Sequence, residues 1–132
     1  MSTRSRIALQ LAEDSFLSVY HHYDGYPQWL GVILRQKFNT REKVAELLDG
    51  GDISCIDSDT NWDRESVENH VQYYNDRGEN TEPRLDLSLE DYLSNGEEYA
   101  YVYTLDHEWV CYELPYQGNP KVVDIPLAVV TQ

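Results

Sequence analysis

The residues whose types could do chemistry gather in one short stretch, residues 20–31. His22 and Asp24 could act as an imidazole base oriented by a carboxylate, and His21 could join them as ligands of a metal ion. Either use needs further partners, and no second histidine at metal-ligand spacing and no Cys-x-x-Cys pair accompanies them. The stretch alone therefore does not specify a reaction.

Turn chemistry accounts for part of this stretch. Glycine after Asp24 permits a sharp turn, and Pro27 suits the first turn of a helix. If residues 16–23 form a strand, His21 and His22 point to opposite faces of the sheet. The corner is then a joint between strand and helix, a recognition surface, or a catalytic site. The recognition surface would consist of His22, Asp24, Tyr26 and Trp29.

Side chains with oxygen atoms alternate in the acidic middle of the chain. Positions 1, 3, 5, 7, 9 and 12 of an EF-hand-like calcium loop would be filled by Asp57, Asp59, Asn61, Asp63, Glu65 and Glu68. However, Trp62 stands where that loop requires glycine, and Arg64 takes a position that is usually apolar. These departures favour an acidic, solvated surface, so we predict no metal and no cofactor.

Tyrosine is frequent, with 11 residues in 132. Alternation places Tyr99, Tyr101 and Tyr103 on one face of a strand, with Trp109 on the strand expected to pair with it. Such a face could be a platform on which a base or nucleotide stacks. Few positive charges lie near it to hold a phosphate, so packing within the sheet is the preferred interpretation.

The charge of the chain is strongly negative, with 24 acidic and 10 basic residues and a formal net charge of -14. Residues 1–41 hold five basic and three acidic residues, whereas residues 42–113 hold four basic and twenty acidic ones. This field disfavours direct binding to nucleic acid or to an anionic membrane, and it favours a partner with a basic surface. Rows of carboxylates could also mimic the phosphates of a nucleic acid.

The pattern of the chain indicates one α+β domain over residues 1–132. Hairpins at residues 6–23 and 98–114 are expected to form one antiparallel sheet. Helices at residues 27–37 and 40–48 are expected to pack as a pair on one face of this sheet.

Smaller elements follow from local signals. Glu42 stands at the capping-box position of an Asn39-Thr40-Arg41-Glu42 helix start, and Ser88 is a good N-cap for a short helix at residues 89–93. A further helix is expected at residues 66–74, within an acidic segment (residues 57–84) that is an insertion or a loop-rich region.

Several motifs can be compared with known families. They are Ser2-Thr3-Arg4-Ser5-Arg6-Ile7-Ala8, Tyr20-x-His22-x-Asp24-Gly25-Tyr26-Pro27 with Leu30-Gly31, Gly51-Asp52-Ile53-Ser54, Tyr92-Leu93, Glu98-Tyr99-Ala100-Tyr101 and Glu108-Trp109-Val110. Together they resemble a family of small bacteriophage proteins that brings no established reaction. His21, Tyr23 and the acidic middle depart from the pattern of that family. The resemblance implies a setting, infection of a bacterium, where small acidic accessory proteins disable host enzymes or defence systems.

We therefore expect a non-enzymatic phage accessory protein in the cytoplasm of the infected cell, which binds and inhibits a basic host or defence protein. A sponge for a small ligand or nucleotide is the first alternative, and a hydrolase-type enzyme using His22 and Asp24 is the second. No signal-peptide pattern or membrane-spanning run is found in the sequence. The oligomeric state stays open, and a homodimer is one option.

Overall fold

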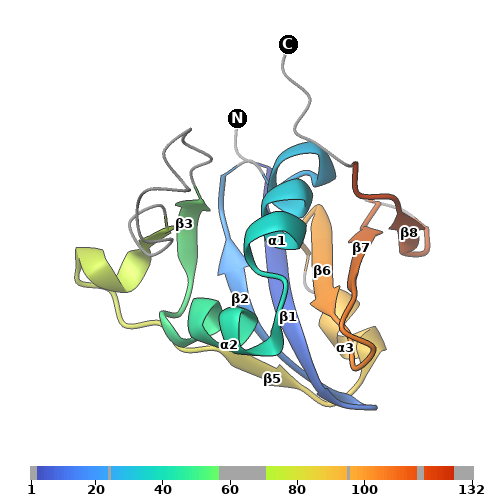
Figure 1. Cartoon of the computed structure of the whole chain (residues 1–132), viewed down its shortest axis with the longest axis horizontal. Coiled ribbons are helices and arrows are strands. Elements are labelled where there is room, and N and C mark those ends of the chain that lie inside the picture. The colour runs from blue at the N-terminus through green and yellow to red at the C-terminus, as the bar shows by residue number, and fades with distance from the viewer. Residues whose placement is uncertain (1–2, 24, 57–70, 95, 116–117, 127–132) are drawn as a thin grey trace.

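The centre of the molecule is a mixed sheet of eight strands. The structure, a computed structural model, describes residues 3–23, 25–56, 71–94, 96–115 and 118–126. The strand order is β4-β3-β2-β1-β6-β7-β8, and β5 also pairs with β2 (Figure 1). The strands are β1 (Ser5–Ala12), β2 (Ser15–His21), β3 (Ile53–Ile56), β4 (Val71–Tyr73), β5 (Arg84–Asp86), β6 (Tyr99–Tyr103), β7 (Trp109–Glu113) and β8 (Lys121–Val123).

Strand direction differs from the prediction. The two expected hairpins are present as the antiparallel pairs β1–β2 and β6–β7. A wholly antiparallel sheet is wrong, because β1 pairs in parallel with β6, and β2 with β3. The reason is the connection before β6, in which helix α3 (Leu89–Leu93) returns the chain to the end of the sheet where β1 begins. There Glu98 N donates to Arg4 O at 3.0 Å, so that β6 starts beside β1.

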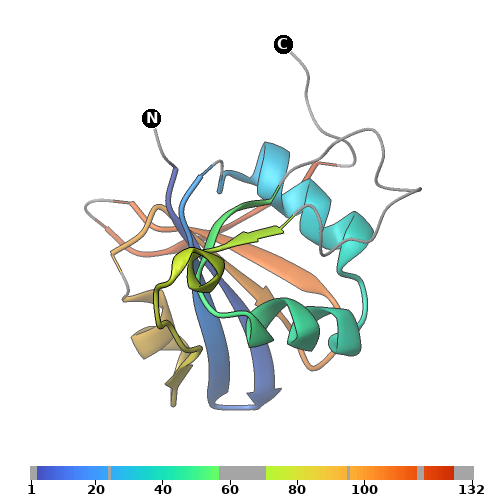
Figure 2. The same ribbon diagram turned by 90° about the vertical axis from the view of Figure 1, so that its left-hand side faces the viewer.

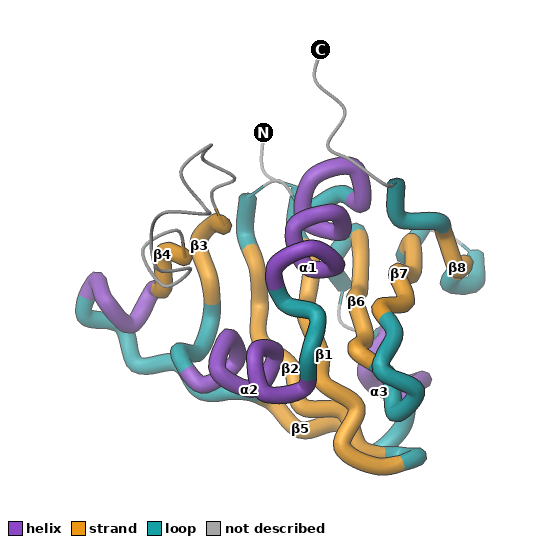
Figure 3. The backbone as a smooth tube through the Cα atoms, in the orientation of Figure 1, coloured by secondary structure: helices purple, strands orange, loops and turns teal. Residues whose placement is uncertain are grey.

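One face of the sheet is covered by the π-helix η1 (Pro27–Gly31) and the helices α1 (Val32–Lys37) and α2 (Arg41–Asp49), as Figure 3 shows. Thr40 caps α2 by accepting a hydrogen bond from Lys43 N at 3.2 Å. Lys43 therefore takes the third helical position, and the capping-box role predicted for Glu42 is wrong. The buried side chains shared by helices and strands include Ile7, Leu9, Val19, Leu30, Ile33, Leu34, Val44, Leu47, Leu48 and Ile53.

The opposite face carries α3, which Figure 2 shows across the strands from α1 and α2. Ser88 caps α3 by accepting a hydrogen bond from Asp91 N at 3.0 Å, which confirms the predicted helix start. Tyr92 is fully buried, and its hydroxyl donates to Tyr101 O at 2.7 Å. The apolar cluster beneath α3 consists of Ala8, Phe16, Tyr92, Ala100 and Val102.

The prediction of a helix at residues 66–74 is wrong for the part of this segment that the structure describes. Val71–Tyr73 forms β4, because β3 offers it an open sheet edge, and Tyr74–Arg77 follows as the 3-10 helix η3. No helix in the described part of the chain is long and apolar enough to cross a membrane. Several predicted site residues lie outside the described residues: Asp24, Asp57, Asp59, Asp63, Glu65 and Glu68.

Candidate functional site

Aromatic rings surround His22 at the predicted corner and form what we call the ring cluster: Tyr20, His22, Tyr23 and Tyr74. The Tyr20 hydroxyl and His22 Nδ1 share a hydrogen bond of 2.6 Å. The His22 ring centroid lies 4.5 Å from that of Tyr23 and 6.5 Å from that of Tyr74, both in edge-on contacts. His22 N and Tyr23 N donate to main-chain oxygens at the start of β3, at 3.1 and 2.9 Å. Paired backbone therefore fixes the centre of the cluster.

Asp52, just before β3, positions two other members of the ring cluster. Its Oδ1 accepts a hydrogen bond from Tyr20 N at 2.9 Å, and its main-chain oxygen accepts one from Tyr74 N at 3.1 Å. Asp52 N in turn donates to Thr81 Oγ1 at 3.0 Å. Asn75 Oδ1 accepts from Thr81 N at 2.7 Å, which completes a connected polar network. We call Asp52, Asn75 and Thr81 the Asp52 network.

The electrostatic surroundings of Tyr20 keep its phenol protonated. Burial raises the pKa of the Tyr20 phenol. The neighbouring Tyr74, Glu97 and Asp52 raise this pKa further, whereas Arg4 lowers it. The phenol therefore stays protonated at neutral pH. Its hydrogen bond with His22 Nδ1 orients the imidazole ring, and the tautomer of His22 decides which of the two groups donates.

His21 lies on the other face of the sheet from His22, as strand alternation predicts. Its side chain is fully buried, with Nδ1 3.4 Å from Ser5 Oγ. Burial lowers the pKa of His21 to about 3, and the nearby His22 adds to this effect. The two histidines cannot ligate one metal ion, and no group of three or more His, Cys, Asp or Glu side chains in the described residues could hold one.

The remaining residues of the corner connect β2 to the helices. Tyr26 is half-buried at the N-cap of η1, and Trp29 Nε1 donates to Ile56 O at 3.3 Å. The hydroxyl of Tyr101 donates to Gly25 O at 2.7 Å. These contacts attach the corner to β3 and β6. The described part of the corner therefore connects β2 to the helices.

The tyrosines of β6 differ in exposure. Tyr99 is half-buried, whereas Tyr101 and Tyr103 are 0% and 1% exposed and have their rings in the core. The Tyr103 hydroxyl donates to Asn39 O at 3.2 Å, and Trp109 Nε1 donates to Phe38 O at 2.8 Å. Both bonds hold the chain directly after α1 against the sheet.

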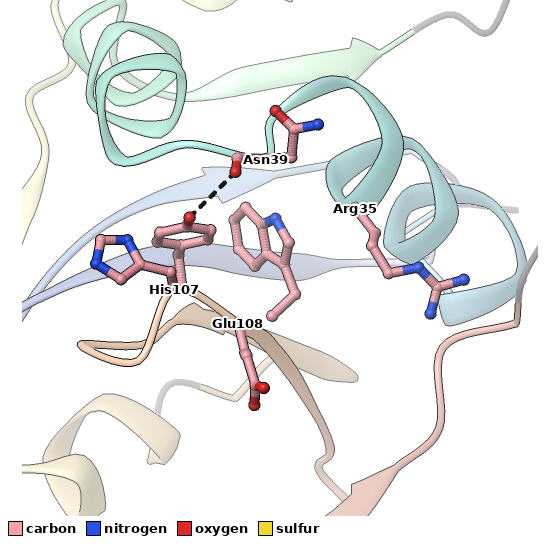
Figure 4. Close-up of a pocket in the computed structure, with 6 residues that line it drawn as sticks. Arg35, Asn39, His107 and Glu108 are labelled. Carbon is pink, nitrogen blue, oxygen red and sulfur yellow. Dashed lines mark hydrogen bonds between the residues drawn. The ribbon is translucent and has the colours of Figure 1, made fainter.

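A pocket of about 310 Å³ opens where the end of α1 meets the β6–β7 turn. Figure 4 shows Arg35 and Asn39 on its helical side and His107 and Glu108 on the turn. The ring of Tyr103 lies 5.3 Å from that of Trp109 and 6.1 Å from that of His107, at steep interplanar angles of 72° and 81°. We call this site the Trp109 pocket; it is lined by Arg35, Asn39, Tyr103, His107, Glu108 and Trp109.

Hydrogen bonds hold the walls of the Trp109 pocket in place, and the polar groups at its rim face solvent. His107 adopts a left-handed backbone conformation (φ 63°) in the turn, where its ring is exposed. The guanidinium of Arg35 turns away from Asn39 and His107 (Figure 4) and donates to Ile125 O at 2.8 Å and to Pro126 O. The pocket therefore presents aromatic surface without a guanidinium aimed into it.

Removal of the Asp52 carboxylate tests how the ring cluster is supported. Asp52→Ala is expected to lower the free energy of unfolding by about 1–2 kcal/mol, because Tyr20 N loses its acceptor in a half-buried place. Asp52→Asn keeps an oxygen at that position and should cost less than about 1 kcal/mol. Urea denaturation of both variants measures the difference. Equal losses would mean that the charge of Asp52, rather than its hydrogen bond, is what matters.

Sequence reasoning identified His22 as a site residue and included Tyr20 only in the surrounding stretch, and it missed the network beneath them. Asp52 was part of a noted Gly-Asp motif, whereas Asn75 and Thr81 lie in a polar stretch without any periodic signal. Arg35 and Asn39 were also missed as neighbours of Trp109, since they lie in α1 and directly after it, some seventy positions away in the chain. Comparison with known protein families, curated proteins and solved structures finds nothing that matches this chain.

Proposed function

We propose that this protein is a non-enzymatic binding protein that docks through surface carboxylates on a partner with a basic surface. The observation that carries the proposal is that the acidic side chains lie at the surface, whereas several of the arginines are engaged inside the fold. Among residues whose exposure the structure describes, fourteen acidic side chains are exposed, against four basic ones: Arg4, Lys43, Arg84 and Lys121. The surface is therefore strongly acidic even where residues 57–70 are left aside.

Arginines contribute little to the surface because the fold uses several of them internally. Arg6 is 8% exposed and donates to Ser18 Oγ at 3.0 Å and to Ser18 O at 3.2 Å. Arg35 donates to the main chain after β8, and Arg41 donates to Gln10 O at 2.8 Å. In these hydrogen bonds the guanidiniums hold neutral oxygens, so the bonds do not pair them with the exposed carboxylates.

Acidic side chains from two segments lie along one edge of the molecule. Glu42, Glu46 and Asp49 recur on the exposed side of α2, away from its buried face. The chain that follows β4 lies next to the end of α2, since Asn75 Nδ2 donates to Gly50 O at 2.9 Å. Its exposed acids are Asp76, Glu79 and Glu82. Such an edge would steer a basic partner and speed its association.

The biological setting of the proposal comes from the sequence. The motifs that resemble a bacteriophage family suggest an infected bacterial cell, and the partner would be a basic host or defence protein that is inhibited on binding. A protein that binds nucleic acid is a suitable target, because its groove already attracts rows of negative charge.

The test is capture of partners from a bacterial lysate at low and high salt. A basic protein should be retained at about 50 mM salt and largely released at about 300 mM, because screening shortens the reach of exposed charges. Two triple variants remove the same number of charges, Glu42→Gln/Glu46→Gln/Asp49→Asn on α2 and Glu13→Gln/Asp14→Asn/Glu90→Gln at the β1–β2 turn and on α3. The α2 variant should lose more capture. Recovery of no basic protein, or capture unaffected by salt, would refute the proposal.

A further inference from the structure

We propose that the Trp109 pocket receives the side chain of an arginine from the basic partner. This inference rests on the proposed function and adds the residues that would recognise a single cationic group. The pocket lies wholly within the described residues, and its volume of about 310 Å³ is at the lower end of the range for ligand sites. That size suits one side chain better than a nucleotide.

The rings of the pocket favour a flat cation. Indole is the strongest of the aromatic groups in attracting a positive charge to its face. The buried ring of Tyr103 packs edge-on against the half-buried Trp109 and against the exposed His107, so it supports both of these rings beside the pocket. A guanidinium is planar and weakly hydrated, and it stacks on aromatic faces more readily than an ammonium does.

The charges around the pocket also favour a cation. Asp106 and Glu108 flank His107 in the β6–β7 turn, and both carboxylates are exposed. In Figure 4 the carboxylate of Glu108 points away from Asn39, so it would attract a cation at the rim and not at the floor. The nearby Arg35 opposes a cation, but its guanidinium is engaged by the oxygens of Ile125 and Pro126.

The floor of the pocket is held in place by hydrogen bonds. Tyr103 is buried there, and its hydroxyl donates to Asn39 O at 3.2 Å. Trp109 keeps its orientation, because its indole N–H donates to Phe38 O. The pocket is thus preorganised, which lowers the entropy lost when a side chain enters it.

Titration with a fluorescein-labelled nonaarginine peptide tests the inference. Trp109→Leu should weaken binding about two- to fivefold, the size expected for an exposed cation–π contact, whereas Trp109→Phe should retain part of the affinity. Glu108→Gln should also weaken binding. Matched controls remove an exposed ring or an exposed carboxylate elsewhere, through Tyr23→Leu in the ring cluster and Glu13→Gln at the β1–β2 turn, and should have smaller effects.

Two failures can be told apart. If the unaltered protein does not bind the peptide even at low salt, the proposed function itself is wrong. If it binds in a salt-dependent way but Trp109→Leu and Glu108→Gln match their controls, the pocket is not the site. Should Trp109→Leu fail to fold, Glu108→Gln still decides, together with the indole N–H resonances of the unaltered protein. The peptide should shift the Trp109 signal and leave that of Trp29 in place; the reverse would overturn the inference.

Discussion

Replacing Gly51 with alanine is expected to lower the free energy of unfolding by about 2–4 kcal/mol. Gly51 has a left-handed backbone (φ 85°), which costs an alanine about 1–2 kcal/mol. An added Cβ would also lie 2.6 Å from both Asn75 Nδ2 and Thr81 Oγ1, so the Asp52 network would have to move. Urea denaturation followed by circular dichroism measures the loss.

Gly78 provides the control for the backbone contribution. It has nearly the same conformation (φ 91°), but a Cβ there would meet no atom within 4 Å. Gly78→Ala should therefore show only the conformational cost, about 1–2 kcal/mol. If the two variants lose equal stability, crowding at Gly51 has no energetic consequence. The Gly51 variant should also disturb the NMR signals of Tyr20 and Tyr74, because Asp52 positions both.

Acid is expected to destabilise the protein through His21. Burial holds the pKa of His21 at about 3 in the folded state, whereas an unfolded histidine titrates near 6.5. Between these pH values the unfolded chain binds a proton that the folded chain does not. The contribution of His21 to the free energy of unfolding is therefore complete above pH 6.5 and is lost as the pH falls toward 3. This residue should contribute a slope of up to about 1.4 kcal/mol per pH unit.

Comparing variants with the unaltered protein separates the contribution of His21 to the pH dependence of stability from that of the carboxylates. His21→Gln cannot titrate, so its stability should depend less on pH between 6.5 and 3 than that of the unaltered protein. His107→Asn removes an exposed histidine at a position whose left-handed backbone asparagine accepts, and it provides the control for the loss of a histidine. NMR titration of the His21 ring gives a direct check. A midpoint near 6.5 would contradict the expected effect.

Elements set by local patterns were predictable from the sequence. Alternation and turn residues located both hairpins, and Ser88 marked the start of α3 correctly. Parallel pairing of β1 with β6 was not predictable, because no local pattern records that α3 returns the chain to the start of β1. Val71 and Tyr74 share a helical stripe in sequence, yet pairing with β3 outweighs that spacing.

The candidate sites were predictable only in part, for a similar reason. Trp109 and Tyr103 could be placed together from strand alternation, since they are paired neighbours in β6 and β7. Arg35 and Asn39 complete the pocket from the end of α1, and the sequence holds no sign of that approach. Asn75 and Thr81 lie near Asp52 because of how the backbone turns around Gly51. The geometry of that turn cannot be predicted from the sequence.

The parallel pairing of β1 with β6 has a consequence for the order of folding. Arg4 and Glu98, which meet at the start of these strands, are 94 positions apart. Contacts of such separation slow folding, because the entropy of closing the loop is lost before the contacts form. During synthesis the β1–β2 hairpin must wait for β6, with one edge of β1 unpaired and able to pair with another chain. The growing chain should therefore depend on chaperones until Tyr103 has left the ribosome.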